Sequence, residues 1–335
     1  MTGRVLVARL DSAGDVLITG PAVRAVAQQA DSVVFLAGPR GRAAAELLPG
    51  VDEILEYRAP WVDLEPPELT ADGIDALIKQ IRDQKIDRAL IFTSFHQSPL
   101  PLALVLRMAG VPWIGAISED YPGALLDVRH RVEGDPPEPE RALSLATACG
   151  FELPADDPGG LQVRRPLPDT AHLTGSDPYV VVHPGAAVPA RRMTIERSRA
   201  LVQSLIDAGR RVVVTGGPDD SDITLAIDGV VDLCGATSFD ELAGVLSSAS
   251  VAVVPNTGPA HLAAAVGTPI VSLFAPVVPV ARWAPYGVRT VVLGDQRAPC
   301  AMTRARTCPV PERHCLDAIG DDEVLRAIEE LEGAR

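Results

Sequence analysis

The chain has 335 residues, of which 47% are hydrophobic and 22% charged, a balance typical of a globular protein with two α/β domains. Its 30 basic and 44 acidic residues give a net charge of −14, which excludes general nucleic-acid binding because such binding depends on neutralising phosphates. No stretch has the roughly 20 uncharged apolar residues of a membrane span, and a strand-like run at 4–10 comes too early for a signal peptide. We therefore expect a cytoplasmic protein without a transmembrane segment, with peripheral association at the inner face of the membrane left open.

The first half of the chain alternates predicted strands and helices. Short apolar runs that are rich in β-branched residues predict strands at 4–10, 32–38, 51–57, 86–95 and 111–118. Helical patterns separate these runs, and another helix is expected within 134–150. Runs this apolar are typical of a parallel sheet that is covered by helices on both faces.

A second α/β series follows a segment at 153–178 that is rich in Pro, Gly and Asp and lacks periodicity. The predicted strands are 178–185, 210–218, 229–235, 250–258, 268–276 and 289–295. We place an N-terminal Rossmann-like domain at 1–165, a linker at 166–177 and a C-terminal Rossmann-like domain at 178–335. The expected fold is α/β with two doubly wound domains facing a central cleft, and the last helix is a candidate for packing back on the N-terminal domain.

The five cysteines do not indicate a disulfide framework, because their number is odd and they are spread along the chain. Cys300, Cys308 and Cys315 cluster next to His314, and such ligands hold zinc in many proteins. Their spacings of eight and seven residues lack the close cysteine pair of a standard zinc site. We therefore expect no metal here, but ordinary thiols in a Pro-rich surface loop.

The first candidate site follows the first predicted strand, in the stretch VARLDSAGDVLITGPAVRAV at 7–26. Asp15 comes directly after Gly14, where the chain turns into a helix. A carboxylate there acts either as a helix cap or as a general base. Because a helix N-terminus stabilises negative charge, we expect Asp15 to be ionised with a low pKa.

The second candidate site is the stretch VVPNTGPAHLAAAVGTP at 253–269. Thr257 is suited to cap a helix that begins at Gly258 and closes at Gly267. The free N–H groups of such a helix start bind phosphate, and His261 lies one turn further on. The equal alternative is an ordinary helix start with a structural histidine.

Four further stretches, 183–193, 212–220, 38–42 and 93–99, are candidates for ligand binding. In HPGAAVPARRM at 183–193, the pair Arg191 and Arg192 is suited to clamp a diphosphate, and the alternative is a solvated surface pair. VVVTGGPDD at 212–220 is not a dinucleotide fingerprint, although a nucleoside edge can rest on its turn. Weaker candidates for acceptor binding, each with a structural alternative, are Arg40, Arg42 and His96.

The sequence resembles glycosyltransferase family 9, the ADP-heptose:lipopolysaccharide heptosyltransferases and their relatives. The resemblance covers essentially the whole chain and is carried, in order, by RLDSAGDVLITGPAVRA, HPGAAVPARRM, VVVTGGPDD, NTGPAHLAAAVGTPIVSLFAP and PCAMTRARTCPVPERHCLDAI. It implies a GT-B fold, with the acceptor on the N-terminal domain and the nucleotide sugar on the C-terminal one. It also implies inverting transfer without a metal.

By this resemblance Asp15 matches the general base, which leaves Asp11 as a structural residue. Arg191 stands where the family has a lysine on the donor diphosphate, and Thr237 falls at the nucleobase pocket.

The family's D-T-G-x-x-H-L motif is matched by Asn256, Thr257, Gly258 and His261, with an amide in place of the aspartate carboxylate. Met193 replaces the family's usual tryptophan. These departures concern the identity of the donor more than the type of reaction.

The expected function is transfer of a heptose or related sugar from a nucleotide-diphosphate sugar to a hydroxyl group. The expected donor nucleotide is ADP, and the acceptor is a glycan, a glycolipid or a natural product. We expect a monomer that uses no cofactor besides its donor. The alternatives are a nucleotide-sugar epimerase and a non-catalytic nucleotide-sugar binder.

Overall fold

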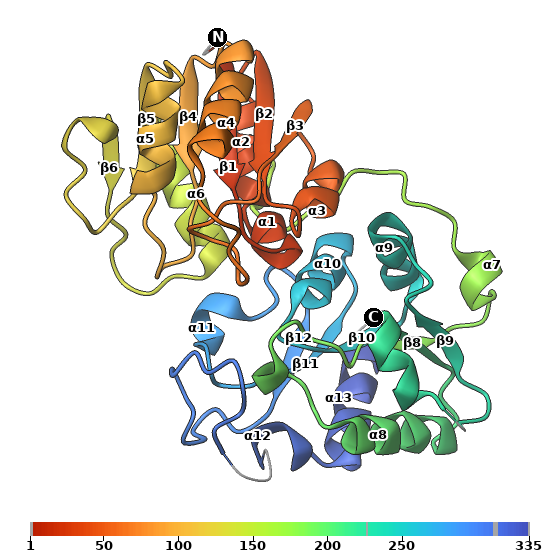
Figure 1. The fold of residues 1–335 in the computed structure, drawn as a ribbon. Helices are drawn as coiled ribbons and strands as arrows, with labels where there is room; N and C mark the ends of the chain where they lie inside the picture. The colour runs from red at the N-terminus through yellow and green to blue at the C-terminus, as the bar shows by residue number, and fades with distance from the viewer. Residues whose placement is uncertain (1–2, 226, 311–313, 334–335) are drawn as a thin grey trace. The chain divides into compact units, whose positions relative to one another are not determined.

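The computed structural model describes residues 3–225, 227–310 and 314–333. The chain divides into two compact units, Met1–Arg164 and Arg165–Arg335, called here the N-terminal and the C-terminal unit. Each unit contains one six-stranded parallel sheet with helices on both faces (Figure 1). The predicted α/β architecture with two doubly wound sheets is therefore confirmed.

The sheet of the N-terminal unit has the strand order β3-β2-β1-β4-β5-β6. Its strands are β1 (Arg4–Arg9), β2 (Ser32–Ala37), β3 (Glu53–Glu56), β4 (Arg88–Ile91), β5 (Trp113–Ile117) and β6 (Val128–His130). The first five lie within the predicted runs. The edge strand β6 was not predicted, because three half-buried residues leave no apolar run to detect.

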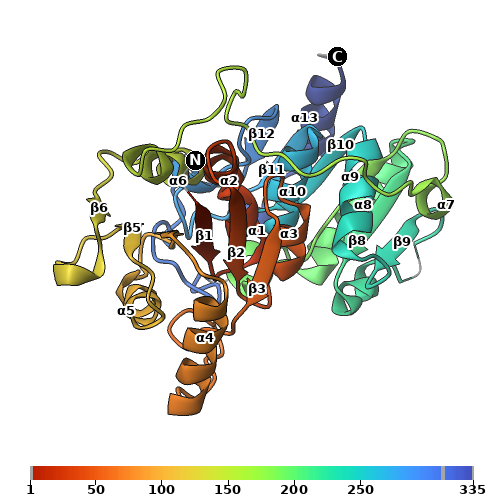
Figure 2. The same cartoon turned by 90° about the horizontal axis from the view of Figure 1, so that it is seen from above.

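Helices cover both faces of this sheet (Figure 2). They are α1 (Ala13–Ile18), α2 (Gly20–Ala27), α3 (Arg42–Leu47), α4 (Ala71–Asp83), α5 (Leu100–Met108) and α6 (Glu138–Ala148), with a 3₁₀ turn η1 (Gly123–Leu125). Leu6 and Ala8 of β1 point into a buried apolar cluster with α4 and α5. The opposite face is covered by α2 and α6, which pack against each other.

The segment after β1 forms two short helices rather than one. α1 ends at Ile18, and α2 begins at Gly20 with Pro21 in its first turn. Proline has no N–H to continue the ladder of an earlier helix, so the chain restarts there.

The sheet of the C-terminal unit repeats the same arrangement, in the order β12-β11-β10-β7-β8-β9. Its strands are β7 (Val180–Val182), β8 (Val212–Gly216), β9 (Val231–Cys234), β10 (Val251–Pro255), β11 (Ile270–Leu273) and β12 (Thr290–Leu293). All six lie within the runs predicted for this half.

Helices cover both faces of this sheet as well. They are α7 (Ala171–Thr174), α8 (Ile195–Asp207), α9 (Phe239–Ser248), α10 (Gly258–Val266), α11 (Val280–Trp283), α12 (His314–Asp317) and α13 (Asp321–Gly333), with 3₁₀ turns η2 (Pro189–Arg191) and η3 (Pro218–Ile223). Apolar residues of α8 and α13 share one buried cluster with the sheet, and α9 packs against α10. An ion pair of 2.6 Å between Arg197 and Asp321 joins α8 to the start of α13. No helix in the described part of the chain is long and apolar enough to cross a membrane.

The boundary between the units falls between two neighbouring arginines. Arg164 donates from its backbone N to Leu47 O at 2.8 Å and from Nε to Leu48 O at 2.9 Å, within the N-terminal unit. Arg165 donates from Nη2 to Val266 O at 3.1 Å, within the C-terminal unit. The segment 166–177, expected to be a linker, follows this boundary and carries α7.

The strand order reverses direction once in each sheet, between β1 and β4 and between β7 and β10. In open parallel sheets, ligands bind beyond the carboxyl ends of the strands at this switch point. The loops that follow these four strands are therefore where a site is expected in each unit.

Candidate active site

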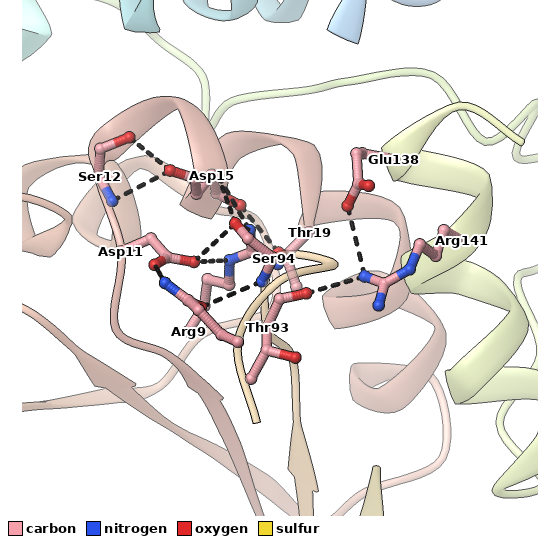
Figure 3. A network of polar contacts seen from close by, with 10 residues as sticks. Arg9, Asp11, Ser12, Asp15, Thr19, Thr93, Ser94, Glu138 and Arg141 are labelled. Atoms are coloured by element: carbon pink, nitrogen blue, oxygen red, sulfur yellow. Dashed lines mark hydrogen bonds and ion pairs between the residues drawn. The ribbon is translucent and has the colours of Figure 1, made fainter. Parts of the chain in front are cut away.

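Two carboxylates share one buried arginine at the switch point of the N-terminal sheet (Figure 3). Arg9 is the last residue of β1 and is 2% exposed. Its Nε lies 2.8 Å from Asp11 Oδ2, and its Nη2 lies 2.9 Å from Asp15 Oδ1. Nη2 also donates to Ser94 Oγ at 3.0 Å, and Ser94 lies just after β4. The network therefore joins the two strands that flank the switch point.

Asp15 combines the two roles that its position allows. Its Oδ2 accepts hydrogen bonds from Ser12 N at 3.2 Å and Ser12 Oγ at 2.6 Å, where Ser12 is the N-cap residue of α1. Its Oδ1 faces Arg9. Capping and catalysis are therefore compatible, because each uses a different oxygen of the carboxylate.

The surroundings of the two carboxylates move their pKa values in opposite directions. Burial raises the pKa of Asp15, but the Arg9 charge and the Ser12 hydrogen bonds outweigh it, so the net pKa lies below the ordinary value. Burial also raises the pKa of Asp11, and there the Arg9 charge does not offset it. Asp15 is therefore ionised at neutral pH, which is the state a general base requires.

A hollow in the N-terminal unit adjoins this network. Gln97 donates from Nε2 to Asp11 Oδ1 at 2.5 Å, and it also lines the hollow together with Trp61, Ser98 and Leu102. The free space in it is about 10 Å³, which is room for about one water molecule, so the hollow itself does not hold a sugar.

Three residues of this network were not singled out from the sequence: Arg9, Ser94 and Gln97. A signal for Arg9 was present, because a cation stands in an apolar run that is expected to be buried on both faces. A buried guanidinium needs carboxylate partners, and Asp11 and Asp15 are the nearest acids in the sequence. Ser94 and Gln97 gave no such signal, because their contacts with Asp11 are long-range.

The candidate acceptor residues lie nearer the surface. Arg42 forms ion pairs with Glu46 at 3.2 Å and Glu56 at 3.8 Å on the outside of α3. Arg40 is exposed in the turn after β2. His96 is exposed and packs edge-on against Phe95 with ring centroids 5.5 Å apart. The role of these three residues in acceptor binding stays a prediction.

At the switch point of the C-terminal sheet, the segments after β7 and β10 lie side by side, because Val182 pairs with Val253. Gly185, after β7, and Gly216, at the end of β8, both pack against the Asp220 carboxylate so closely that a Cβ on either would collide with it. Asp220 Oδ2 in turn accepts from Gly217 N at 2.9 Å. A larger residue at 185 would therefore have to displace the Asp220 carboxylate, so glycine is favoured there by the close approach of a side chain.

The helix start after β10 forms as predicted. Thr257 is the N-cap residue of α10, and Gly267 ends the helix in the left-handed region with φ of 88°. Asn256 is 3% exposed, and its Nδ2 has no hydrogen-bond partner among the described residues. A buried amide without a partner is costly, so a ligand acceptor atom at this point would compensate it. His261 is 4% exposed on the first turn of α10.

The remaining candidate donor residues are spread along the same edge of the sheet. Arg191 ends the 3₁₀ turn η2, whereas the neighbouring Arg192 lies 3.9 Å from Asp220. Thr237 lies between β9 and α9. β7 and β8 separate β9 from β10, so Thr237 stands apart from the Asn256 segment, as a nucleobase contact would from a phosphate contact.

His183 follows β7 at the same switch point, and its role was not predicted. Its Nδ1 lies 3.0 Å from Thr215 Oγ1, and burial lowers the pKa of His183 to about 4. The ring is therefore neutral near pH 7. It lines a narrow hollow with Met193, Ser198 and Pro255, next to Asn256 in the chain.

The five cysteines are free thiols. Burial raises the pKa of Cys315 to about 11, with Cys300 and Cys308 nearby. Among residues 3–225, 227–310 and 314–333, no group of three or more His, Cys, Asp or Glu is arranged to hold a metal ion. Residues 311–313 of the predicted loop lie outside the described residues.

Comparison with known proteins identifies a family by sequence. A model of glycosyltransferase family 9 (heptosyltransferase) matches residues 74–314. Lipopolysaccharide heptosyltransferase 3 of Escherichia coli is 33% identical over 104 residues, which is 29% of this chain and 31% of the relative. Lipopolysaccharide heptosyltransferase 2 of Escherichia coli K12 is 28% identical over 224 residues, 59% of this chain and 62% of the relative. These matches span less than two thirds of either relative.

The solved structure of the Escherichia coli ADP-heptose lipopolysaccharide heptosyltransferase II matches with a TM-score of 0.76 at 21% identity, over 99% of both chains. This likeness is one of fold, and the shared architecture of two Rossmann-like units is the GT-B fold. It agrees with the strand order of both sheets.

Proposed function

Because the chain belongs to glycosyltransferase family 9, we propose that it is an inverting, metal-independent glycosyltransferase. The donor is a nucleotide-diphosphate sugar, with ADP as the expected nucleotide and a heptose or a related sugar as the group transferred. The acceptor is a hydroxyl group of a glycan, a glycolipid or a natural product. The observation that carries the proposal is the ionised Asp15 carboxylate, held by Arg9 at the switch point of the N-terminal sheet.

In the proposed reaction the acceptor oxygen attacks C1 of the sugar from the side opposite the diphosphate. The bond from this oxygen to C1 forms while the bond from C1 to the diphosphate oxygen breaks, which inverts the configuration at C1. The hydroxyl proton passes to Asp15. A carboxylate with a low pKa suffices, because the oxygen becomes strongly acidic as its bond to C1 forms.

The leaving nucleoside diphosphate gains negative charge as it departs. In the C-terminal unit, the N–H groups at the start of α10 near Thr257 and Gly258 and the guanidinium of Arg191 are the groups proposed to stabilise it. The Asn256 amide is proposed to bind the donor through the Nδ2 that has no partner among the described residues. Thr237 is the proposed contact of the nucleobase.

The charge of the N-terminal unit favours an uncharged acceptor. Residues 1–164 contain 24 acidic and 15 basic side chains, and Arg42 is already paired with acids. A polyanionic acceptor would meet a field of like sign, whereas a neutral sugar hydroxyl would not.

The test begins with a thermal-shift screen of ADP-, GDP-, UDP- and TDP-sugars, because a ligand at 100 times its dissociation constant adds about 2.7 kcal/mol of stability. Mass spectrometry then measures transfer to acceptors with the donor that binds. Asp15→Asn should lower kcat by at least ~100-fold and leave the donor Kd within about threefold. Asp156→Asn, an exposed carboxylate of the same unit, is the matched control and should behave as wild type.

Two results would overturn the proposal. One is weakened donor binding with unchanged turnover in Asp15→Asn, which would remove the base role. The other is saturable donor binding by the wild type without transfer to any acceptor or slow hydrolysis, which would favour a binding protein. Metal independence is tested separately, because activity abolished by EDTA and restored by Mg²⁺ would contradict it.

A further inference from the structure

Arg9 is an unusual residue for the centre of a parallel sheet. It ends β1, which lies between β2 and β4, and its side chain is 2% exposed. Burying a guanidinium costs much free energy unless charged partners compensate it, and here two carboxylates do so. Replacing a whole buried ion-pair cluster by apolar residues is often neutral for stability, so the presence of this cluster at the switch point calls for an explanation in terms of the site.

We propose that Arg9 is a positioning residue for the Asp15 base, and that Asp11 serves as the second anchor of its guanidinium fork. The inference rests on the proposed glycosyltransferase function and assigns a role to the residues around its base. Arg9 does not touch the substrate in this proposal, since it acts through Asp15.

The hydrogen bonds of Asp15 show which of its oxygens is available. A carboxylate oxygen has two lone pairs, and both on Oδ2 are taken by Ser12 N and Ser12 Oγ, at 3.2 and 2.6 Å. Oδ1 accepts one short bond from Arg9 Nη2 at 2.9 Å, and Ser94 Oγ lies at 3.5 Å. Oδ1 is therefore the oxygen with room for the proton of an acceptor hydroxyl, and Arg9 fixes its direction.

Asp11 holds the other side of the fork. Its Oδ2 lies 2.8 Å from Arg9 Nε, and its Oδ1 accepts from Gln97 Nε2 at 2.5 Å. Both of its oxygens are therefore bound by groups on β1 or in the loop after β4, and its side chain is 9% exposed against 17% for Asp15, so Asp15 is the carboxylate more open to a substrate hydroxyl. Ser94 Oγ lies 3.3 Å from Asp11 Oδ2 and 3.5 Å from Asp15 Oδ1, so it links the two carboxylates.

The charged groups around Arg9 come from the segment after β1 and from α6. Asp11 and Asp15 follow β1, and Glu138 and Arg141 belong to α6. Glu138 is 2% exposed, lies 3.4 Å from Arg141 and adds to the negative potential at Arg9. Both Asp11 and Asp15 face the positive charge of Arg9. Removing this charge should therefore raise the pKa of each carboxylate.

The test compares Arg9→Met and Arg9→Lys with the wild type, with donor and acceptor saturating. Arg9→Met removes the charge and the fork, whereas Arg9→Lys keeps the charge but offers one nitrogen where the fork offers several. The readouts are kcat, the donor Kd and the pH at which kcat falls on the acid side. Arg4→Met, at the opposite end of the same strand and paired with Glu53 at the surface, is the control.

We expect Arg9→Met to lower kcat by ~100-fold or more, with the donor Kd within about threefold. The acid limb of its pH profile, which is the pH at which kcat falls on the acid side, should move up by at least about one pH unit. The reason is that Asp15 loses the charge that keeps it ionised. Arg9→Lys should lower kcat by about tenfold, with an acid limb between the other two, and Arg4→Met should match the wild type. A purely structural role would reduce the folded fraction without moving the acid limb.

If Arg9→Met does not fold, Arg9→Lys and the double variant Arg9→Met/Asp11→Asn decide the question, since the latter removes one cation and one anion together. Wild-type kcat and an unmoved acid limb in Arg9→Lys, or a loss confined to donor binding, would overturn the inference. These results are distinct from failure of the proposed function, which would show as no transfer by the wild type or as full activity in Asp15→Asn.

Discussion

Replacing Asp157 by alanine should destabilise the N-terminal unit through the loss of a buried ion pair with Arg24 and of the hydrogen bond that Asp157 Oδ1 accepts from Gly159 N at 2.9 Å. Arg24 of α2 places Nε 2.6 Å from Asp157 Oδ2 and Nη2 2.9 Å from Asp157 Oδ1. The same Nη2 donates to Gly160 O at 2.8 Å, and the two charged side chains are 9% and 11% exposed. Without Asp157, the guanidinium stays buried with one carbonyl as its partner.

The magnitude follows from this geometry. Breaking a buried ion pair by removing one partner costs about 3–5 kcal/mol, and the remaining bond to Gly160 places this case near 3 kcal/mol. In a unit of this size each 1 kcal/mol lowers Tm by about 2–4 °C. The expected loss in Asp157→Ala is therefore ~6–12 °C in the transition of the N-terminal unit.

Differential scanning calorimetry at pH 7 is the assay, with Asp156→Ala, the exposed neighbour, as control. The pH dependence adds a second check. Hydrogen bonds from Arg24 hold the pKa of Asp157 below its usual value, so its contribution is complete above the unfolded pKa of about 3.9. That contribution is lost as the pH falls through the lower, folded pKa. The gap between variant and wild type should therefore narrow below about pH 4.

A Tm within about 2 °C of wild type at pH 7 would refute the reasoning. It would mean that the guanidinium finds water or another acceptor once the carboxylate is gone. A full-sized gap that persists at pH 2 would refute the electrostatic part, because Asp157 would then act through packing alone.

Three further predictions concern other parts of the chain. Gly185→Ala should cost about 1–3 kcal/mol in calorimetry and weaken donor binding, because the new Cβ meets Asp220, whereas Gly217→Ala has ordinary room and should be tolerated. The His183 ring should titrate near pH 4 by NMR, and stability should fall as the pH drops from 6.5 towards that value, since the unfolded chain takes up the proton first; a midpoint above 6 would contradict this. Burial raises the pKa of Cys149 to about 12, so iodoacetamide at pH 8 should label it only after unfolding in urea, and rapid labelling of the native protein would show that the thiol is accessible.

The strands could be predicted because each central strand is a continuous apolar run, and such runs arise when both faces of a strand are covered. β6 could not, since its residues are Val128, Arg129 and His130 and only one neighbouring strand supports it. Pro21 indicates the break between α1 and α2, because proline favours the first turn of a new helix. The stretch was nevertheless interpreted as a single helix.

The candidate site divides in the same way between local and long-range features. Thr257 and Gly267 are local signals, since capping and left-handed termination depend on neighbouring residues alone, and both formed as expected. Asp15 stood out by its place after a turn. Its tie to Arg9 and Ser94 depends on how β1 and β4 pair, which spacing in the sequence does not reveal. The Asp220 carboxylate beneath Gly185 is long-range in the same sense.

The pair Arg164 and Arg165 determines how the two units are connected. Consecutive residues are each fastened to a different unit, Arg164 to Leu48 O and Arg165 to Val266 O. The chain therefore passes from one unit to the other within a single peptide bond, so glycines inserted there would leave each arginine with its hydrogen bonds inside its own unit.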